Sequence, residues 1–353
     1  MLTKKQIEEL KEHLEKAQNP VFYYDNDADG LCSFVIFRRY LGRGKGVAIR
    51  SFPDLNASYA RKAKELNADY IFVLDKPMLS KEFVEEIDHL QLPLVWIDHH
   101  EVLPNEFESS FSNLFIYNPA RNTGKDKSTE PVTYWAFKIS QKKEDVWLAF
   151  MGCIADHYMP DFVGDFKEKY PDFLGEVKEP FEAYFKTEIG KIAQALNFGL
   201  KDSVTHVVQL QNFLISCKSP REILEEVPIN YAFRKKYSEI KKKYDELVKK
   251  AKLSSEGNLI FFEYSGEISM SSDIANELSY IYPKKYIAVV YRKEAIANVS
   301  LRGKNVRAIL ESVLKGVQGH GGGHEDAVGA RLRIEDLPMF KEILTKQIEH
   351  ERS

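Results

Sequence analysis

The sequence has few cysteines, no long apolar run and no large excess of charge of either sign. Its three cysteines, Cys32, Cys153 and Cys217, lie far apart and form no CxxC pair. This excludes a disulfide framework and a zinc ribbon, and it fits a reducing compartment. No apolar run is long enough to span a bilayer, and the first residues are charged rather than an apolar signal core. We therefore expect a cytoplasmic protein with no membrane contact.

The chain also lacks a global basic field, because its formal net charge is -3 although 29% of its residues are charged. Any contact with nucleic acid must then come from local patches. With 353 residues, of which 44% are hydrophobic, the chain is long for one domain and can bury two cores.

Three short apolar runs in the N-terminal half each end in an aspartate, and helical patterns lie between them. The runs span residues 21–24, 71–74 and 94–97 and are followed by Asp25, Asp75 and Asp98. Alternating strands and helices predict a parallel sheet with helices on both faces. Ligands of such sheets bind beyond the carboxyl ends of the strands, which is where these aspartates are expected.

The rest of the chain divides into a helical segment and a second α/β pattern. Residues 231–252 are rich in lysine and predict one long solvated helix, whose lysines could alternatively follow a phosphate backbone. We predict an α/β fold with three parts. They are an N-terminal parallel-sheet domain at 1–190, a helical linker at 191–256 and a smaller C-terminal α/β domain at 257–353.

Two polar clusters could carry chemistry. The turn from Asp25 to Gly30 alternates carboxylates as a calcium EF-hand loop does, but Ile36 stands where that loop needs its glutamate. A solvated acidic turn is the alternative. The second cluster, Asp98-His99-His100, could equally be a surface pair of histidines, and Asp75 and Asp156 could simply cap helices.

The joint arrangement favours metal binding. Carboxylates and imidazoles gathered at one sheet edge repel like charges, and divalent cations relieve that repulsion. Mixed carboxylate and histidine ligands suit manganese, with magnesium or zinc as competitors. Two metal ions about 4 Å apart are the usual device for splitting a phosphodiester with water.

Four ordered motifs carry a resemblance to a known family. They are Asp25-x-Asp27-x-Asp29-Gly30, Asp75, Asp98-His99-His100 and Gly152-Cys153-Ile154-Ala155-Asp156. This order resembles the DHH phosphoesterase superfamily, and the triple-aspartate form of the first motif resembles its RecJ branch. The nanoRNase/pAp-phosphatase and type II pyrophosphatase branches usually begin that motif with histidine. Residues 298–302 and 321–324 resemble the DHH-associated substrate-binding domain.

The resemblance implies roles for individual residues. Asp25 and Asp27 would hold one ion, Asp29, His99 and Asp156 a second, and Asp75 would bridge both. The two ions would be manganese or magnesium. Asp98 would orient a neighbouring histidine, and His100 would stabilise charge at the scissile phosphate. At His157, where RecJ-like chains carry a small apolar residue, the sequence departs from the pattern.

The C-terminal motifs imply that the second domain binds the substrate. Arg302 can fork onto a phosphate, and Gly321, Gly322 and Gly323 would let the backbone approach a nucleotide. Ser300 belongs to the same motif as Arg302, and His324 could reach the same phosphate. A flexible loop is the alternative for the glycine run.

The implied function is a RecJ-like exonuclease on single-stranded DNA or RNA or on short oligonucleotides, with a replication, repair or RNA-processing protein as a partner. Long RecJ proteins carry an additional oligonucleotide-binding barrel, for which we expect no room after residue 335. A nanoRNase, a 3′,5′-bisphosphate nucleotide phosphatase or a cyclic-dinucleotide phosphodiesterase is the alternative. A non-enzymatic scaffold is disfavoured, because every expected ligand position is filled.

Overall fold

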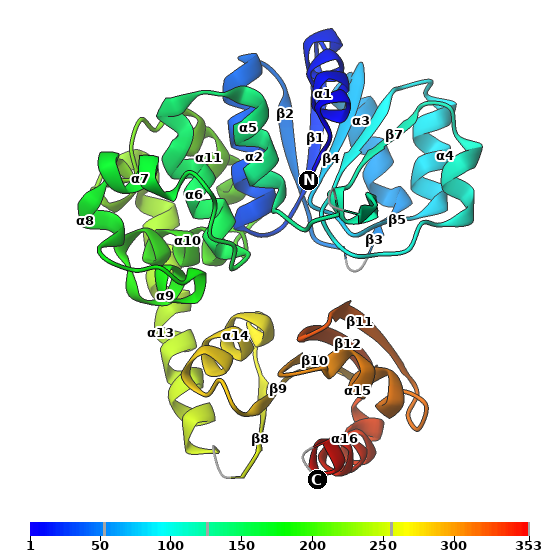
Figure 1. The fold of residues 1–353 in the computed structure, drawn as a ribbon, viewed down its shortest axis with the longest axis vertical. Coiled ribbons are helices and arrows are strands. Elements are labelled where there is room, and N and C mark those ends of the chain that lie inside the picture. Colours follow the sequence, from blue (N-terminus) through cyan, green and yellow to red (C-terminus); the bar gives the residue numbers. More distant parts are fainter. Residues whose placement is uncertain (52–53, 125–126, 255–256, 352–353) are drawn as a thin grey trace. The chain divides into compact units, whose positions relative to one another are not determined.

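The computed structural model describes residues 1–51, 54–124, 127–254 and 257–351 of the chain (Figure 1). The chain divides into two compact units, Met1–Tyr237 and Ser238–Ser353. The predicted fold class is confirmed: a parallel sheet with helices comes first, a helical region follows, and a small mixed sheet comes last. None of the described helices is long and apolar enough to cross a membrane.

Unit 1 is built on a five-stranded sheet in the order β2-β1-β4-β6-β7, with every neighbouring pair parallel. The strands are β1 (Pro20–Asp25), β2 (Lys45–Ile49), β4 (Tyr70–Leu74), β6 (Leu94–Ile97) and β7 (Leu114–Tyr117). Every residue of β4 and β6 is buried, as expected for strands covered on both faces. Since β1, β4 and β6 are neighbours, the residues that follow them lie along one edge.

Helices cover both faces of this sheet. Phe22 and Tyr24 of β1 pack in one core with α1 (Lys4–Lys16), α2 (Ala28–Leu41), α5 (Val132–Ser140) and α6 (Val146–Ala155). Val21 and Tyr23 pack in the other core with α3 (Ala60–Glu65) and α4 (Lys81–His89). This alternation is the period of two that a strand imposes. A two-stranded sheet of β3 (Asp54–Leu55) and β5 (Met78–Leu79) lies beside the second core.

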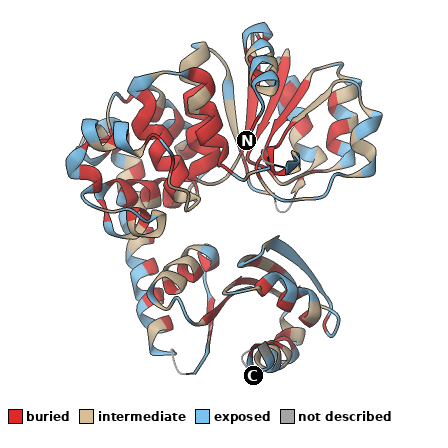
Figure 2. Cartoon of the chain, viewed as in Figure 1, coloured by how far each residue is buried: buried red, intermediate tan, exposed pale blue. Residues whose placement is uncertain are grey.

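The remaining helices of unit 1 extend the first core. They are α7 (Val163–Lys169), α8 (Pro171–Leu174), α9 (Pro180–Lys186), α10 (Glu188–Gly199), α11 (Val204–Ser216) and α12 (Arg221–Leu224). Helices α2, α5 and α6 are buried along most of their length (Figure 2), so they need cover on more than one side. Residues 191–237, assigned to a linker from the sequence, provide part of that cover through Leu196 and Leu214.

The long lysine-rich helix is present as α13 (Tyr231–Leu253). It is not solvated all round, because Phe233, Ile240, Tyr244 and Val248 are buried. Several of its lysines lie beside acidic side chains: Lys241 pairs with Asp245, Lys243 with Glu267 and Lys252 with Glu277. These contacts favour a packing role for the helix.

Unit 2 holds a five-stranded mixed sheet in the order β11-β12-β10-β9-β8. Its strands are β8 (Leu259–Ser265), β9 (Tyr286–Lys293), β10 (Ile296–Arg302), β11 (Gly319–His324) and β12 (Ala327–Arg333). Helices α15 (Val306–Val313) and α16 (Leu337–Glu351) share a core with β9, β10 and β12, and α14 (Ser271–Ile281) contacts β9 and β10. The glycine run therefore forms an edge strand, β11.

Candidate metal centre and substrate-binding residues

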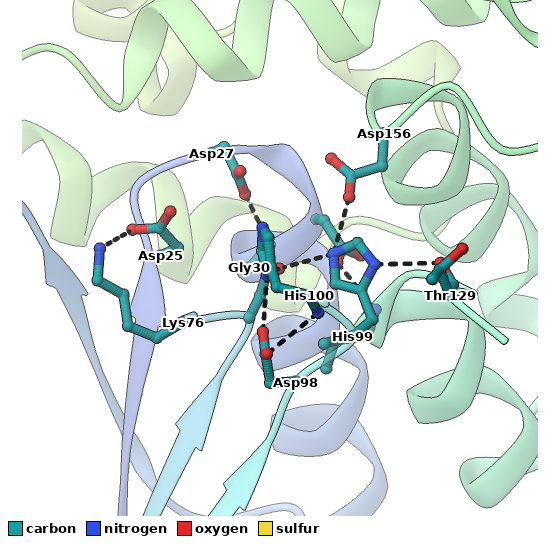
Figure 3. Close-up of polar contacts among 12 residues, drawn as sticks. Asp25, Asp27, Gly30, Lys76, Asp98, His99, His100, Thr129 and Asp156 are labelled. Carbon is teal, nitrogen blue, oxygen red and sulfur yellow. Dashed lines mark hydrogen bonds and ion pairs between the residues drawn. The ribbon is translucent and has the colours of Figure 1, made fainter. Parts of the chain in front are cut away.

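Three of the predicted aspartates lie at the carboxyl edge of the first sheet, and two of them, Asp25 and Asp98, are labelled in Figure 3. Asp25 ends β1, Asp75 follows β4 and Asp98 follows β6. The backbone of Asp75 is in the left-handed region, with φ 58°, which costs free energy for a residue other than glycine. Its N–H donates to Ile97 O at 2.9 Å, so the neighbouring strand holds the residue in this conformation.

The first turn of α2 positions the other two acids of the first motif. Asp27 caps the helix, and its Oδ1 accepts a hydrogen bond from Gly30 N–H at 2.9 Å. Asp29 is fully buried, and its carboxylate accepts from Val132 and Thr133 N–H, both at 2.8 Å. These two N–H groups begin α5, where the helix dipole favours a negative charge. A Cβ at Gly30 would lie 2.5 Å from Asp25 O, which explains why the motif needs glycine there.

Four residues bring their ligand atoms together. One donor atom from each of Asp29, Asp75, His99 and Asp156 lies within 4.8 Å of the others. His99 Nε2 is 3.2 Å from Asp75 Oδ1 and 3.1 Å from Asp156 Oδ2. Within the described part of the chain, neither oxygen of the buried Asp75 carboxylate accepts a well-formed hydrogen bond. A buried carboxylate without donors fits a divalent cation, so this group is a candidate metal site.

Asp98 and His100 form a pair that adjoins these residues, because Asp75, His99 and His100 also bring one ligand atom each within 4.8 Å of the others. Asp98 Oδ1 is 2.8 Å from His100 Nδ1, and Asp98 Oδ2 accepts from the N–H of His100 at 3.1 Å. Asn118 Nδ2 donates to Asp98 Oδ2 and to His100 O, each at 3.0 Å. The carboxylate therefore fixes the orientation of the His100 ring, which is the geometry that its predicted role requires.

Asp25 and Asp27, the predicted ligands of the other ion, do not belong to the four-residue group. Instead Asp25 Oδ1 accepts from Lys76 Nζ at 2.9 Å. Figure 3 shows Lys76 with Asp25 on one side of the site, and His99 with Asp156 on the other. The sequence interpretation overlooked Lys76, although a lysine directly after the end of a buried strand is a usable signal.

The crowding of acids perturbs their titration. Burial and then the charges of Asp25, Asp156 and Asp29 raise the pKa of Asp27 to about 8. Burial and the charge of Asp156 raise the pKa of Asp29 to about 6. Burial, followed by the charges of Asp27 and Asp29, raises the pKa of Asp75 well above its ordinary value. A bound cation would offset the repulsion between the acids, which adds to the effect of burial.

The same negative charges also raise the pKa values of the two histidines. Burial lowers the pKa of His99, but its contacts with Asp156 and Asp75 outweigh burial and hold that pKa well above its ordinary value. The pKa of His100 is raised as well, because Asp98 outweighs burial. His157, the departure from the RecJ-like pattern, stacks on Phe181 with ring centroids 3.9 Å apart. A packing contact therefore accounts for this histidine.

In unit 2, two of the predicted substrate-binding residues contact α14. Arg302 Nε donates to Asn276 Oδ1 at 2.6 Å, and Arg302 Nη1 donates to Leu301 O at 2.9 Å and Val328 O at 3.3 Å. Ser300 Oγ lies 2.9 Å from Ser271 Oγ. The guanidinium is thus oriented by contacts at Nε and Nη1. Ser300 and Arg302 remain predicted substrate-binding residues.

The three glycines of β11 differ in what surrounds them. A Cβ at Gly321 would lie 2.5 Å from Gly329 O, and one at Gly323, where φ is +143°, would lie 2.5 Å from Ala327 O. Among the described residues, none other than its two chain neighbours comes within 4 Å of a Cβ built at Gly322. Packing against β12 gives a reason for glycine at 321 and 323, and their contact with a substrate stays a prediction. Close approach of a ligand stays a prediction for Gly322, and contact with a phosphate stays one for His324.

A parallel α/β sheet with carboxylates and imidazoles at its carboxyl edge, followed by a small mixed-sheet domain, defines the class of this protein. The model of the DHH family N-terminal domain matches residues 21–156, and the model of the DHHA1 domain matches residues 259–350. The chain therefore belongs to the DHH family, as the sequence motifs predicted. No curated protein matches the sequence significantly.

Solved structures have the same fold at low sequence identity. RecJ of Thermus thermophilus in complex with Mn2+ has a TM-score of 0.67 at 15% identity, and the match covers 98% of this chain and 54% of that one. The DHH domain of a member of a ribosomal protein family has a TM-score of 0.70 at 12% identity, covering 98% and 89%. CDC45 from Entamoeba histolytica has a TM-score of 0.53 at 13% identity, covering 97% and 98%. The chain thus spans about half the length of this RecJ.

Proposed function

We propose that the chain is a metal-dependent phosphodiesterase, a RecJ-like exonuclease that hydrolyses single-stranded DNA or RNA by a two-metal mechanism. The observation that carries the proposal is the convergence of Asp29, Asp75, His99 and Asp156 on one point, with donor atoms within 4.8 Å. The similarity to RecJ in complex with Mn2+ supports manganese as the metal. RecJ of Thermus thermophilus in complex with Mg2+ also matches, so magnesium is the second candidate.

The four converging residues would hold one ion, and Asp25 and Asp27 would complete a second position that shares Asp75. Bound divalent ions supply a water of lowered pKa and polarise the phosphate. The protein itself keeps Asp75 and Asp29 buried. The N–H groups of Val132 and Thr133 also orient the Asp29 carboxylate. Mixed carboxylate and imidazole donors are consistent with manganese.

His100 would act on the scissile phosphate. The Asp98 carboxylate, held by Asn118 Nδ2 at 3.0 Å, fixes the ring through Nδ1. The contact with Asp98 outweighs burial and raises the pKa of His100, so this carboxylate stabilises positive charge on the ring. A charged ring can donate from Nε2 to a phosphate oxygen and offset the negative charge that develops during hydrolysis.

Arg302 would bind a phosphate that does not react. The contacts of Arg302 with Asn276 Oδ1 and Val328 O orient its guanidinium, which lowers the ordering cost of binding a phosphate. Ser300, Gly322 and His324 would contribute to binding the same part of the substrate. A protein partner from replication, repair or RNA processing would add affinity for longer strands, and co-purification from the native host tests this.

The deciding experiment is digestion of 20-nucleotide single-stranded DNA and RNA, labelled at either end, with Mn2+ and with chelator. We expect stepwise shortening from one end that requires the metal and is absent from the Asp75→Asn variant. Hydrolysis of a dinucleotide, a 3′,5′-bisphosphate nucleotide or a cyclic dinucleotide, with the 20-mer left intact, would favour the short-substrate alternative. Undiminished digestion in chelator would contradict the proposal.

A further inference from the structure

Lys76 is a buried cation inside a cluster of acids. Its side chain is 1% exposed, and Nζ donates to Asp25 Oδ1 at 2.9 Å and to Ser51 O at 2.8 Å. The backbone of the residue is held too, because Lys76 O accepts from Trp96 Nε1–H at 2.7 Å. An ammonium this deeply buried is tolerated only with such partners. Its position is therefore well determined by the fold.

The consecutive residues Asp75 and Lys76 contact different members of the cluster. The backbone of Asp75 is left-handed, with φ 58°, and its Oδ1 lies 3.2 Å from His99 Nε2. Lys76 instead reaches Asp25 (Figure 3). The four residues whose donor atoms converge include Asp75 but not Asp25. The acid cluster is therefore divided into a half whose ligand atoms converge and a half in which the Asp25 carboxylate is paired with an ammonium.

We propose that the Lys76 ammonium acts as a permanent cation at Asp25 and makes the two metal positions unequal. This inference rests on the proposed function. One Mn2+ binds tightly at Asp29, Asp75, His99 and Asp156. A second, at Asp25 and Asp27, binds at least tenfold more weakly because Lys76 weakens it.

Two physical effects produce the inequality. Lys76 Nζ donates a charge-assisted hydrogen bond to Asp25 Oδ1, so it competes with a metal ion for the electron density of this carboxylate. A divalent ion beside Asp25 is also repelled by the ammonium, and this repulsion is weakly screened because Lys76 is buried. The tight site experiences less repulsion, since Asp25 is not among its four ligands and two of these, His99 and Asp156, lie on the side of the site away from Lys76 (Figure 3).

The test is titration of the metal-stripped full chain with Mn2+, followed by calorimetry and by electron paramagnetic resonance for pairs of coupled ions. Wild type should bind one ion tightly and a second at least tenfold more weakly. The Lys76→Met variant, similar in length but uncharged, should tighten the second site at least tenfold. Lys81→Met removes an exposed lysine of the same unit and should behave as wild type. Equal affinities in wild type, or no tightening in Lys76→Met, would overturn the inference.

A second variant covers the case in which Lys76→Met fails to fold. Asp25→Asn with Lys76 in place should leave the tight site within about threefold of wild type, because Asp25 is not among its four ligands. Loss of more than tenfold in tight binding would overturn the inference. If Lys76→Met does fold, adding Asp25→Asn to it should abolish the gained affinity.

The outcomes also separate this inference from the proposed function. Absence of any Mn2+ binding to wild type would remove the basis of the proposed function and of the inference together. Two ions of equal affinity would leave the proposed function standing and overturn only the role of Lys76.

Discussion

Asp75 combines strain, burial and charge in one residue. Its φ is 58°, its side chain is 1% exposed, and the described residues direct no well-formed hydrogen bond to its oxygens. Each of these properties costs free energy in a metal-free protein. Such costs in free energy are typical of functional sites, and here they indicate the binding of a cation.

Asp75→Asn should separate binding from folding. The amide keeps the shape of the side chain but removes the charge that attracts the metal, so tight Mn2+ binding should fall at least a hundredfold and hydrolysis by several orders of magnitude. The metal-free variant should melt at the same temperature as wild type or higher, because a repelling charge is gone. Calorimetry and thermal melts measure both, with the exposed Asp165→Asn as control. Wild-type metal affinity in Asp75→Asn would contradict the assignment.

The stability of the metal-free protein should depend on pH in a defined direction. Burial and neighbouring acids raise the pKa of Asp27 to about 8 and of Asp29 to about 6 in the folded state. The folded protein therefore binds more protons than the unfolded chain above about pH 4, where an ordinary aspartate has lost its proton. Linkage then requires stability to fall as pH rises from about 4 towards 8.

Melting curves in chelator between pH 5 and 8 measure this slope. Saturating Mn2+ should flatten it, because the metal takes the place of the protons, and Asp27→Asn should reduce it in chelator. The lowered pKa of Asp156, where burial is outweighed by His99, acts in the opposite direction but only at more acidic pH. A stability that rises across this range in chelator would show that the acids are not crowded as described.

At the scale of elements, the local signals were sufficient for the strands and their terminal aspartates. An apolar run that ends in Asp25, Asp75 or Asp98 is a pattern within one segment, and the sheet edge follows from parallel topology. Contacts between residues that are far apart in the sequence leave no such local pattern. The bond of Asn197 Oδ1 to Ala28 N–H at 2.8 Å links residues 169 positions apart, so the packing of the supposed linker was not foreseeable.

Substitutions of the three glycines of β11 can distinguish a packing role from a role in substrate binding. Gly321→Ala and Gly323→Ala place a Cβ 2.5 Å from backbone oxygens of β12, so each should destabilise the protein by about 1–3 kcal/mol. Gly322→Ala meets no described residue within 4 Å other than its two chain neighbours and should leave stability within about 0.5 kcal/mol. Denaturant unfolding checks the stabilities, and substrate affinity of Gly322→Ala then reports on ligand approach. Equal losses of stability at all three positions would refute the described packing.

Arg302 and Asn276 join β10 to α14, and they should act on substrate affinity together. Arg302→Ala should raise KM roughly 10- to 100-fold with little change in kcat, because a contact to a non-reacting phosphate is made equally in ground and transition states. Asn276→Ala should raise KM less, because the guanidinium keeps its bonds to Leu301 O and Val328 O. Steady-state kinetics decide this. A collapse of kcat at unchanged KM would assign Arg302 to the chemistry instead.

At the scale of the whole molecule, the depth of the candidate metal centre limits the substrate. Asp29, Asp75 and His99 are 0%, 1% and 5% exposed, so a scissile phosphate must enter the protein to reach a metal held there. A base pair cannot enter without melting, which costs on the order of 1.4 kcal/mol per stacked step. Single strands avoid this cost and can stack on aromatic groups.

We therefore predict cleavage of a single-stranded oligonucleotide at least tenfold faster than of the matched blunt duplex. The net charge of -3 should keep the salt dependence modest, because few phosphates are neutralised by a chain without a basic excess. Initial rates on the two substrates at several salt concentrations measure both effects. A duplex with a single-stranded tail is the informative control, because cleavage should proceed along the tail and slow at the junction. Equal rates on the single strand and the blunt duplex would mean that the buried acids become accessible to a paired end, and the candidate centre would then have to open before catalysis.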